Sequence, residues 1–136
     1  MKDCLLKQAG IPTPPFGVAR SPDEAAKIAA DLKSNDLVVK AQVLTGGRGK
    51  GHFQNTTIGG VVMCESPEQV KQVSEKMIGN LLITKQTGVA GRICNSVMVT
   101  TRMFPRKEYY LSIMLERTFN VSLRENKLNL NINDRK

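Results

Sequence analysis

Two segments of the chain carry apolar residues at helical spacing, and each follows a Ser-Pro pair, at Ser21 and at Ser66. Serine is a favourable N-cap, and proline suits the first position of a helix. The pattern therefore predicts one helix over residues 22–33 and another from residue 67 up to Gly79. A short helix is also expected over residues 2–9, because a glycine and a proline-rich run follow it.

Short apolar runs rich in β-branched residues lie between the predicted helices and predict strands. These strands are expected near residues 16–19, 37–43, 61–64 and 81–84. Two further runs, residues 96–102 and 109–115, are expected to pair with each other as a hairpin. Helices that alternate with strands in this way indicate an α/β (α+β) fold, a sandwich of helices on sheet.

Composition and charge narrow the class of protein. A chain of 136 residues with 40% hydrophobic residues is the size of one globular domain. Its longest apolar runs are far shorter than the roughly 20 residues that a membrane-spanning helix needs. The net charge of +8 favours an anionic partner, which could be nucleic acid, an acidic membrane surface or a phosphate-bearing small molecule. No targeting peptide is visible at the N-terminus.

The cysteines and the single histidine do not form a recognisable site. The three cysteines stand at wide, unrelated spacings, which argues against a disulfide framework and against a structural zinc site. No histidine is placed in sequence to activate a thiol, so we interpret the cysteines as buried small residues. His52 is interpreted as an ordinary loop residue. We assign no catalytic residue and no metal ligand.

The sharpest feature is a glycine-rich segment, Thr-Gly-Gly-Arg-Gly-Lys-Gly at residues 45–51, directly after a predicted strand. Glycines let backbone N–H groups approach an oxyanion closely, and Lys40, Arg48 and Lys50 add positive charge. The segment has neither the Walker A nor the Rossmann spacing. Phosphate binding is the functional interpretation. The alternatives are a flexible basic hairpin loop and, for Lys40, a lysine whose stem simply reaches solvent.

Nucleic-acid binding is the weaker interpretation of the same charge. The six aromatic residues are not interleaved with a basic run, as a base-stacking platform would require.

Several motifs together resemble those of one family, the β subunits of mitochondrial succinate–CoA ligases, and more closely the ADP-forming type. They are VVKAQVLTGGRGKG at residues 38–51, MIG at 77–79, TKQTG at 84–88, GRICN at 91–95 and RKEYY at 106–110. The resemblance covers about residues 1–120 and implies a partial ATP-grasp domain, with residues 16–95 as its small nucleotide-clamping subdomain. Residues 121–136 are a divergent tail, expected to be poorly ordered, with a short edge strand as the alternative.

The resemblance also implies the roles of particular residues. Lys40 matches a lysine that contacts nucleotide phosphates, and Gly47, Arg48 and Gly49 match the segment that lies over the nucleotide. Glu108 matches a carboxylate that accepts hydrogen bonds from the nucleotide. Without the resemblance, Glu108 would be interpreted as an exposed partner of the basic residues that precede it.

Relatives carry an acidic residue where this chain has Thr100 and Thr101. This departure bears on how the base and ribose would be recognised.

By resemblance, the reaction is the reversible conversion of succinate, CoA and ATP to succinyl-CoA, ADP and phosphate in the tricarboxylic acid cycle. The resemblance implies the mitochondrial matrix as location and an α subunit as partner, which supplies the phosphorylated histidine. It also implies magnesium as cofactor, although the family's magnesium ligands belong to a later part of the domain that is absent here. We therefore expect a fragment, splice product or partial gene model that is truncated at both ends and inactive in isolation.

Truncation would leave apolar faces of the strands in residues 96–115 uncovered. Two alternatives remain at this point. One is a short non-catalytic isoform that binds nucleotide or a partner subunit, and the other is a basic nucleic-acid-binding module.

Overall fold

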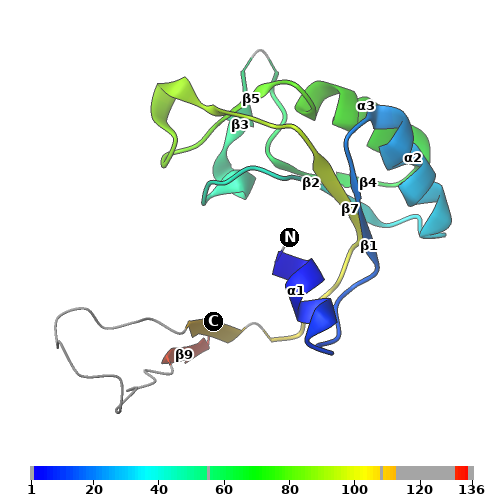
Figure 1. Ribbon diagram of the computed structural model, residues 1–136, viewed down its shortest axis with the longest axis vertical. Helices are drawn as coiled ribbons and strands as arrows, with labels where there is room; N and C mark the ends of the chain where they lie inside the picture. Colours follow the sequence, from blue (N-terminus) through cyan, green and yellow to red (C-terminus); the bar gives the residue numbers. More distant parts are fainter. Residues whose placement is uncertain (1, 55, 108, 113–130, 135–136) are drawn as a thin grey trace, which may run out of the picture. The chain divides into compact units, whose positions relative to one another are not determined.

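The computed structural model describes residues 2–54, 56–107, 109–112 and 131–134. The chain divides into two compact units, Met1–Met103 and Phe104–Lys136, and each is described by itself. The first unit holds a four-stranded sheet, a three-stranded sheet and the helices (Figure 1). In the second unit β8 (Tyr109–Ser112) pairs antiparallel with β9 (Asn131–Asp134).

The larger sheet of the first unit has the strand order β1-β7-β2-β4, and all its neighbouring strands are antiparallel. The strands are β1 (Phe16–Ala19), β7 (Val97–Thr101), β2 (Leu37–Ala41) and β4 (Val61–Cys64). Because both β1 and β2 run antiparallel to β7, they run parallel to each other, with β7 between them. The helix α2 (Pro22–Asp31) connects them, so the unit is a split β-α-β arrangement.

The hairpin predicted from residues 96–102 and 109–115 is wrong. β7 pairs with β1 and β2, which are remote in sequence, and the strand at Tyr109 pairs with β9. Sequence proximity favours a hairpin, but β7 buries Val97 to Thr100 by inserting between two strands already linked by α2. The predicted exposure of its apolar side chains is therefore also wrong, since each of these four side chains is at most 5% exposed. The side chains of residues 109–115, which the same prediction included, lie outside the described ones.

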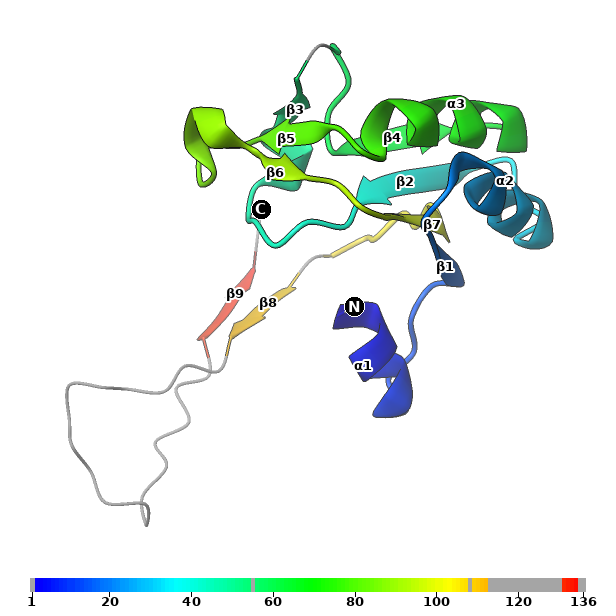
Figure 2. The ribbon, with the colours of Figure 1, turned by 45° about the horizontal axis from the view of Figure 1, so that its top comes forward.

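The helices α2 and α3 (Pro67–Met77) lie side by side on one face of the larger sheet (Figure 2). They pack small and apolar side chains against alternate residues of the strands. This core contains Ala25, Ala29, Val70 and Met77 from the helices and Ala19, Leu37, Val39, Ala41, Cys64, Val97 and Val99 from the strands. The predicted mixed fold is confirmed, as are the helices and strands predicted for this unit. Two further strands of two residues each, His52–Phe53 and Arg92–Ile93, were not predicted.

Element ends differ from the prediction by one or two residues. α2 ends at Asp31 because Lys33 adopts a left-handed conformation, with φ of 48°, that no longer continues a helix. β2 ends at Ala41, after which the N–H of Gln42 donates to the carbonyl of Ser96. The short N-terminal helix α1 (Lys2–Gln8) forms as predicted.

Both long helices begin with the same capping arrangement. Ser66 Oγ accepts the N–H of Gln69 at 3.3 Å, and Gln69 Oε1 accepts the N–H of Glu65 at 2.8 Å. Ser21 and Glu24 repeat this exchange at the start of α2. Two backbone N–H groups are thereby satisfied at each helix start.

Replacing Ser66 by alanine should remove the acceptor for the N–H of Gln69 and lower the free energy of unfolding by about 1 kcal/mol. Ser66→Asp keeps an acceptor at this position and should stay close to the parent protein. Urea unfolding followed by circular dichroism measures both variants. An alanine variant as stable as the aspartate variant would show that the cap does not contribute.

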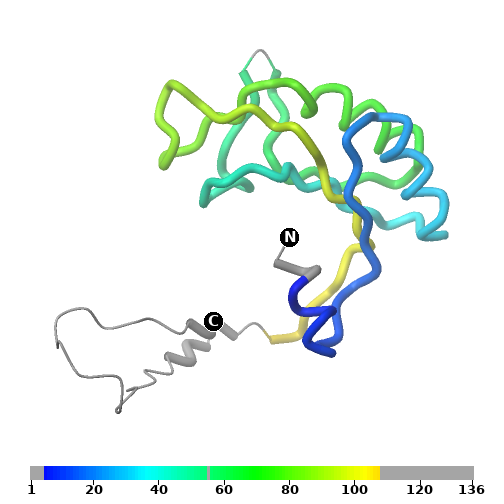
Figure 3. The backbone as a smooth tube through the Cα atoms, viewed as in Figure 1, coloured from blue at the N-terminus to red at the C-terminus, as the bar shows by residue number. Residues whose placement is uncertain are grey.

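A smaller sheet packs at the end of the unit where β2 leads into the glycine-rich segment (Figure 3). Its strands are β3 (His52–Phe53), β5 (Leu81–Ile83) and β6 (Arg92–Ile93), with β5 in the middle. Two short 3-10 helices, η1 (Arg48–Lys50) and η2 (Gly88–Ala90), belong to the same end of the unit. Phe53 and Leu82 are fully buried and tie this sheet to the common core.

For residues 121–136 we expected poor order, with an edge strand as the alternative. Asn131–Asp134 form β9, and the rest of this segment lies outside the described residues. Among the residues that the structure describes, no helix is long and apolar enough to cross a membrane.

Candidate functional site: a lysine and an anchored glycine loop on the open sheet face

The face of the larger sheet opposite to α2 and α3 is defined by the strand register. Residues directly opposite each other in antiparallel strands point to the same side of the sheet. One row across this face is therefore Val18, Met98, Lys40 and Val61, and the next is Phe16, Thr100, Val38 and Met63. We call this side the open face because α2 and α3 lie on the other side of the sheet. It is mostly apolar; its central residues Val38, Met98 and Thr100 are buried, whereas Val18, Val61 and Met63 are exposed.

Lys40 is the one basic residue in these two rows, and it stands between Met98 and Val61. Its side chain is half-buried, and no carboxylate pairs with it among the described residues. The aliphatic stem can lie on the apolar face while the ammonium group remains available at its surface. An unpaired cation above an apolar face suits a ligand that carries both a flat apolar part and an anionic part.

The glycine loop, residues 45–51, folds back onto the end of β2. Arg48 Nη1 donates to the carbonyl oxygen of Ala41 at 2.7 Å, next to Lys40 in sequence. The Arg48 carbonyl in turn accepts the N–H groups of Gly51 and Gly60, both at 3.2 Å. The loop is thus held by backbone hydrogen bonds, in contrast to the flexible hairpin that we considered as an alternative.

Two of the glycines at this end serve close packing and not ligand approach. A Cβ atom on Gly60 would lie 2.7 Å from the Arg48 carbonyl oxygen, and one on Gly51 would lie 2.6 Å from the Ile83 carbonyl oxygen. Both distances are too short for a methyl group. Gly60 lies nine residues after the loop, so its part in the site was missed by the sequence interpretation.

The middle of the loop keeps its N–H groups available. Gly47 is left-handed, with φ of 71°, and begins the single turn of η1. Within the described part of the chain, the N–H groups of Gly47, Arg48 and Gly49 have no acceptor. The structure therefore brings Lys40, Gly47, Arg48 and Gly49 to the same end of the first unit. Glu108, the remaining predicted site residue, lies outside the described residues.

Charge is segregated in the first unit. Residues 37–64 contain no Asp or Glu. Apart from Asp3 in α1, the acidic residues of the first unit lie on or beside α2 and α3: Asp23, Glu24, Asp31, Asp36, Glu65, Glu68 and Glu75. The loop end is consequently positive, which fits a phosphate group. It does not fit a magnesium ion, which prefers carboxylate oxygens, and the described residues contain no cluster of three or more His, Cys, Asp or Glu.

Thr100 and Thr101 point to opposite faces of β7. Thr100 lies in the second row of the open face, and its hydroxyl donates to the Pro15 carbonyl at 2.9 Å. Thr101 is paired with Leu37 on the helix side. Neither threonine offers the carboxylate that relatives carry in this strand, so any acceptor for ribose hydroxyls must come from elsewhere.

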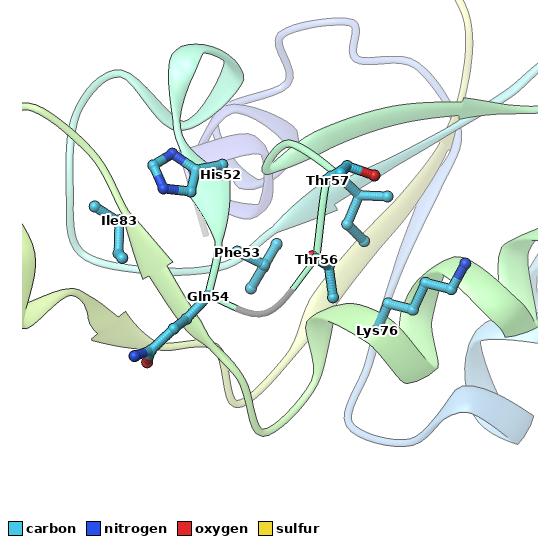
Figure 4. A pocket seen from close by; sticks show the side chains of 8 residues that line it. His52, Phe53, Gln54, Thr56, Thr57, Lys76 and Ile83 are labelled. Carbon is cyan, nitrogen blue, oxygen red and sulfur yellow. The ribbon is translucent and has the colours of Figure 1, made fainter.

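A separate depression lies beside β3 and is lined by His52, Gln54, Thr56 and Lys76, among others (Figure 4). His52 is exposed and belongs to β3, not to a loop. The imidazole and the Lys76 ammonium group point away from each other, so the polar groups do not converge on one ligand. This depression is therefore not part of the candidate site.

The described cysteines are buried and unreactive by environment. Burial raises the pKa of the Cys64 thiol, and burial is also the largest effect on Cys94, whose pKa is raised as well. A raised pKa keeps the thiol protonated and disfavours the nucleophilic thiolate.

The first unit is a domain of mixed α and β structure that carries Lys40 and the anchored glycine loop at one end. The family model described as ATP-grasp domain matches residues 2–123, and the chain belongs to this family. The chain is similar to succinate–CoA ligase (ADP-forming) subunit β, mitochondrial, of Columba livia, with 58% identity over 115 residues. That match covers 85% of this chain and 28% of the relative.

Two further relatives carry the same type of name. The hydrogenosomal β subunit of Neocallimastix frontalis is 52% identical over 113 residues, and the mitochondrial β subunit of Saccharomyces cerevisiae is 48% identical over 113 residues. Each match covers 83% of this chain and 26% of the relative. The chain therefore spans about a quarter of the length of the curated relatives that it matches, and it is similar to mitochondrial-type ADP-forming β subunits over most of its own length.

Proposed function

We propose that this chain forms one wall of the ATP site of an ADP-forming succinate–CoA ligase β subunit. The observation that supports it best is the placement of Lys40. This unpaired cation lies on the apolar open face, directly before the strand end to which Arg48 anchors the glycine loop. The exposed apolar residues of this face, Val18, Val61 and Met63, suit an adenine ring, and the ammonium group suits the phosphates.

Each residue of the loop has a role in this proposal. Lys40 neutralises phosphate charge, and the available N–H groups of Gly47, Arg48 and Gly49 donate to phosphate oxygens. Arg48 has one guanidinium N–H engaged with Ala41, so it holds the loop in place and presents its remaining N–H groups to the ligand. Glu108 is proposed, by resemblance, to accept hydrogen bonds from the nucleotide.

Phosphoryl transfer depends mainly on positioning and charge stabilisation. In this proposal the chain binds and orients ATP for the reversible formation of succinyl-CoA, ADP and phosphate from succinate, CoA and ATP. Magnesium, when bound, would neutralise charge on the transferred phosphoryl group, with ligands that the described residues do not supply. The proposed partner is the ligase α subunit, and the proposed location is the mitochondrial matrix, after the mitochondrial relatives.

Lys40→Met should weaken Mg-ATP binding to the purified chain by about tenfold or more, because a desolvated charge-assisted contact to phosphate is lost. Isothermal titration calorimetry measures the Kd, and methionine preserves the packing of the lysine stem. Lys27→Met removes an exposed lysine of α2 and is the matched control, with an expected Kd equal to that of the parent.

Titrations with Mg-GTP and duplex DNA accompany this measurement. Preference for ATP over GTP supports the ADP-forming assignment. Tight salt-dependent DNA binding that is insensitive to Lys40→Met, without nucleotide binding, would contradict the proposed function.

A further inference from the structure

A cluster of four polar side chains joins the glycine loop to the turn after β5. We call it the clasp; it consists of Thr45, Thr84, Gln86 and Thr87. Gln86 Oε1 accepts two hydrogen bonds from the loop, one from the N–H of Gly46 and one from the Thr45 hydroxyl at 3.2 Å. These bonds connect residues that are 40 and 41 positions apart in the chain.

Thr84 is the centre of the clasp. Its side chain is nearly buried, and its hydroxyl oxygen accepts the N–H groups of Gln86 at 3.3 Å and of Thr87 at 3.2 Å. The N–H of Thr84 donates to Thr87 Oγ1 at 2.9 Å. The turn that carries Gln86 is therefore shaped by its own hydrogen bonds before Gln86 contacts the loop.

The hydroxyl protons of the clasp can all be placed without conflict. Thr84 Oγ1 lies 3.1 Å from Thr45 Oγ1, and it can donate its one proton there. Thr45 then donates its proton to Gln86 Oε1, and Thr87 donates to the Thr84 carbonyl. Each hydroxyl donates once, as its chemistry requires, so every hydroxyl proton of the clasp has an acceptor within it.

The orientation of the Gln86 amide follows from the same contacts. The N–H of Gly46 is only a donor, so the atom that faces it must be the amide oxygen and not the amide nitrogen. The loop side of Gln86 is thus an acceptor. Substitutions that keep or remove this acceptor can separate its effect from that of side-chain size.

We propose that Gln86 is a positioning residue. It holds the first half of the glycine loop in place and thereby maintains the affinity of the loop for nucleotide. The part of this inference that concerns nucleotide affinity rests on the proposed function. Thr45 and Gly46 connect the end of β2 to Gly47, where the left-handed turn starts. Without the Gln86 acceptor, the N–H of Gly46 is released to water. Among the described residues, the loop then keeps only the contact with Thr84 as a hydrogen bond to the turn after β5.

The test compares Gln86→Met, Gln86→Glu and the control Gln72→Met, which removes an exposed glutamine of α3. Gln86 is exposed, so all three variants should fold, and urea unfolding verifies this. The first readout is the exchange rate of the Gly46 amide proton by NMR in the free protein. The second is the Kd for Mg-ATP by calorimetry.

Gln86→Met should accelerate Gly46 exchange by about five- to tenfold, which corresponds to one lost hydrogen bond, and should raise the Kd by a similar factor. Gln86→Glu keeps an acceptor and should restore the slow exchange of Gly46, although its added negative charge will itself weaken ATP binding. If Gln86 acted only through the size of its side chain, Gln86→Glu would not restore the slow exchange of Gly46. Gln72→Met should change neither readout.

Unchanged Gly46 exchange in Gln86→Met overturns the proposal, and so does faster exchange with an unchanged Kd. Failure of the parent chain to bind Mg-ATP would contradict the proposed function instead. In that case the exchange rates, which need no nucleotide, still decide whether Gln86 holds the loop.

Discussion

Phe53→Ala should lower the free energy of unfolding by about 3–5 kcal/mol, the largest effect that we expect from a single substitution in this chain. Phe53 is 0% exposed and is the largest fully buried side chain among the described residues. It lies in β3, and its side chain belongs to the core shared with Leu82 of β5 and with the helices. Alanine would leave a cavity where the smaller sheet meets this core.

Urea unfolding followed by far-UV circular dichroism measures the loss. Phe53→Leu is the matched control, since it keeps most of the apolar volume and should cost a fraction of the alanine effect. The expected loss is a large part of the total stability of a domain of this size, so the alanine variant should be partly unfolded near room temperature. Equal stability of the alanine and leucine variants would contradict the role assigned to Phe53.

Gly60→Ala should destabilise the chain by about 1–3 kcal/mol and should also weaken Mg-ATP binding, because its new methyl group would collide with the glycine loop. The Cβ atom would stand 2.7 Å from the Arg48 carbonyl oxygen and 3.1 Å from Leu82 Cδ2. The same carbonyl accepts the Gly60 N–H, so the substitution strains both the packing and the hydrogen bond that hold the loop.

Gly49→Ala provides the matched control for stability. Its Cβ atom would meet only Val61 Cγ2 at 3.9 Å, an ordinary contact, so its free energy of unfolding should stay within about 0.5 kcal/mol of the parent. Urea unfolding and calorimetric titration with Mg-ATP measure both glycine variants. A Gly60→Ala protein with the stability of Gly49→Ala would show that the loop is not packed against Gly60.

Phe53→Ala and Gly60→Ala test two different interactions that hold the candidate site in place. Phe53 stabilises the small sheet on which the loop end of the unit is built, whereas Gly60 allows direct contact between the loop and the strand that follows it. Gln86 adds a third support from the other side of the loop. The candidate phosphate-binding loop is therefore held by groups from three places: two that follow it closely in sequence, Phe53 and Gly60, and one that is remote, Gln86.

Much of the fold was accessible from local sequence patterns. The two Ser-Pro caps marked the starts of α2 and α3 because each serine satisfies a backbone N–H three residues ahead. β-Branched runs marked β1, β2, β4 and β5 to within two residues. Such features depend on neighbouring residues alone, and a single sequence contains them in full.

The site was accessible in part. Glycines and basic residues after a strand indicated a phosphate-binding loop. The resemblance predicted that Lys40, Gly47, Arg48 and Gly49 lie against the nucleotide and that Glu108 is a further nucleotide contact. That Arg48 also holds the loop to Ala41 was not predictable, because an arginine in a glycine-rich loop gives no sign of its acceptor. The TKQTG motif contributed to the family resemblance, but nothing in its spacing indicated that Gln86 contacts Gly46.

The sequence by itself determined the helices, the strands other than the short β3 and β6, the positive loop and the absence of acidic residues in the segment around it. Only the tertiary structure decided that β7 inserts between β1 and β2, that Lys40 faces the open side of the sheet, and that Gly60 and Gln86 hold the glycine loop. The physical reason is the distance along the chain over which the two kinds of interaction act. Helical and strand periods are set by interactions between near neighbours, whereas strand order, register and loop anchoring depend on which remote surfaces bury the most apolar area and satisfy the most backbone groups once the chain is closed.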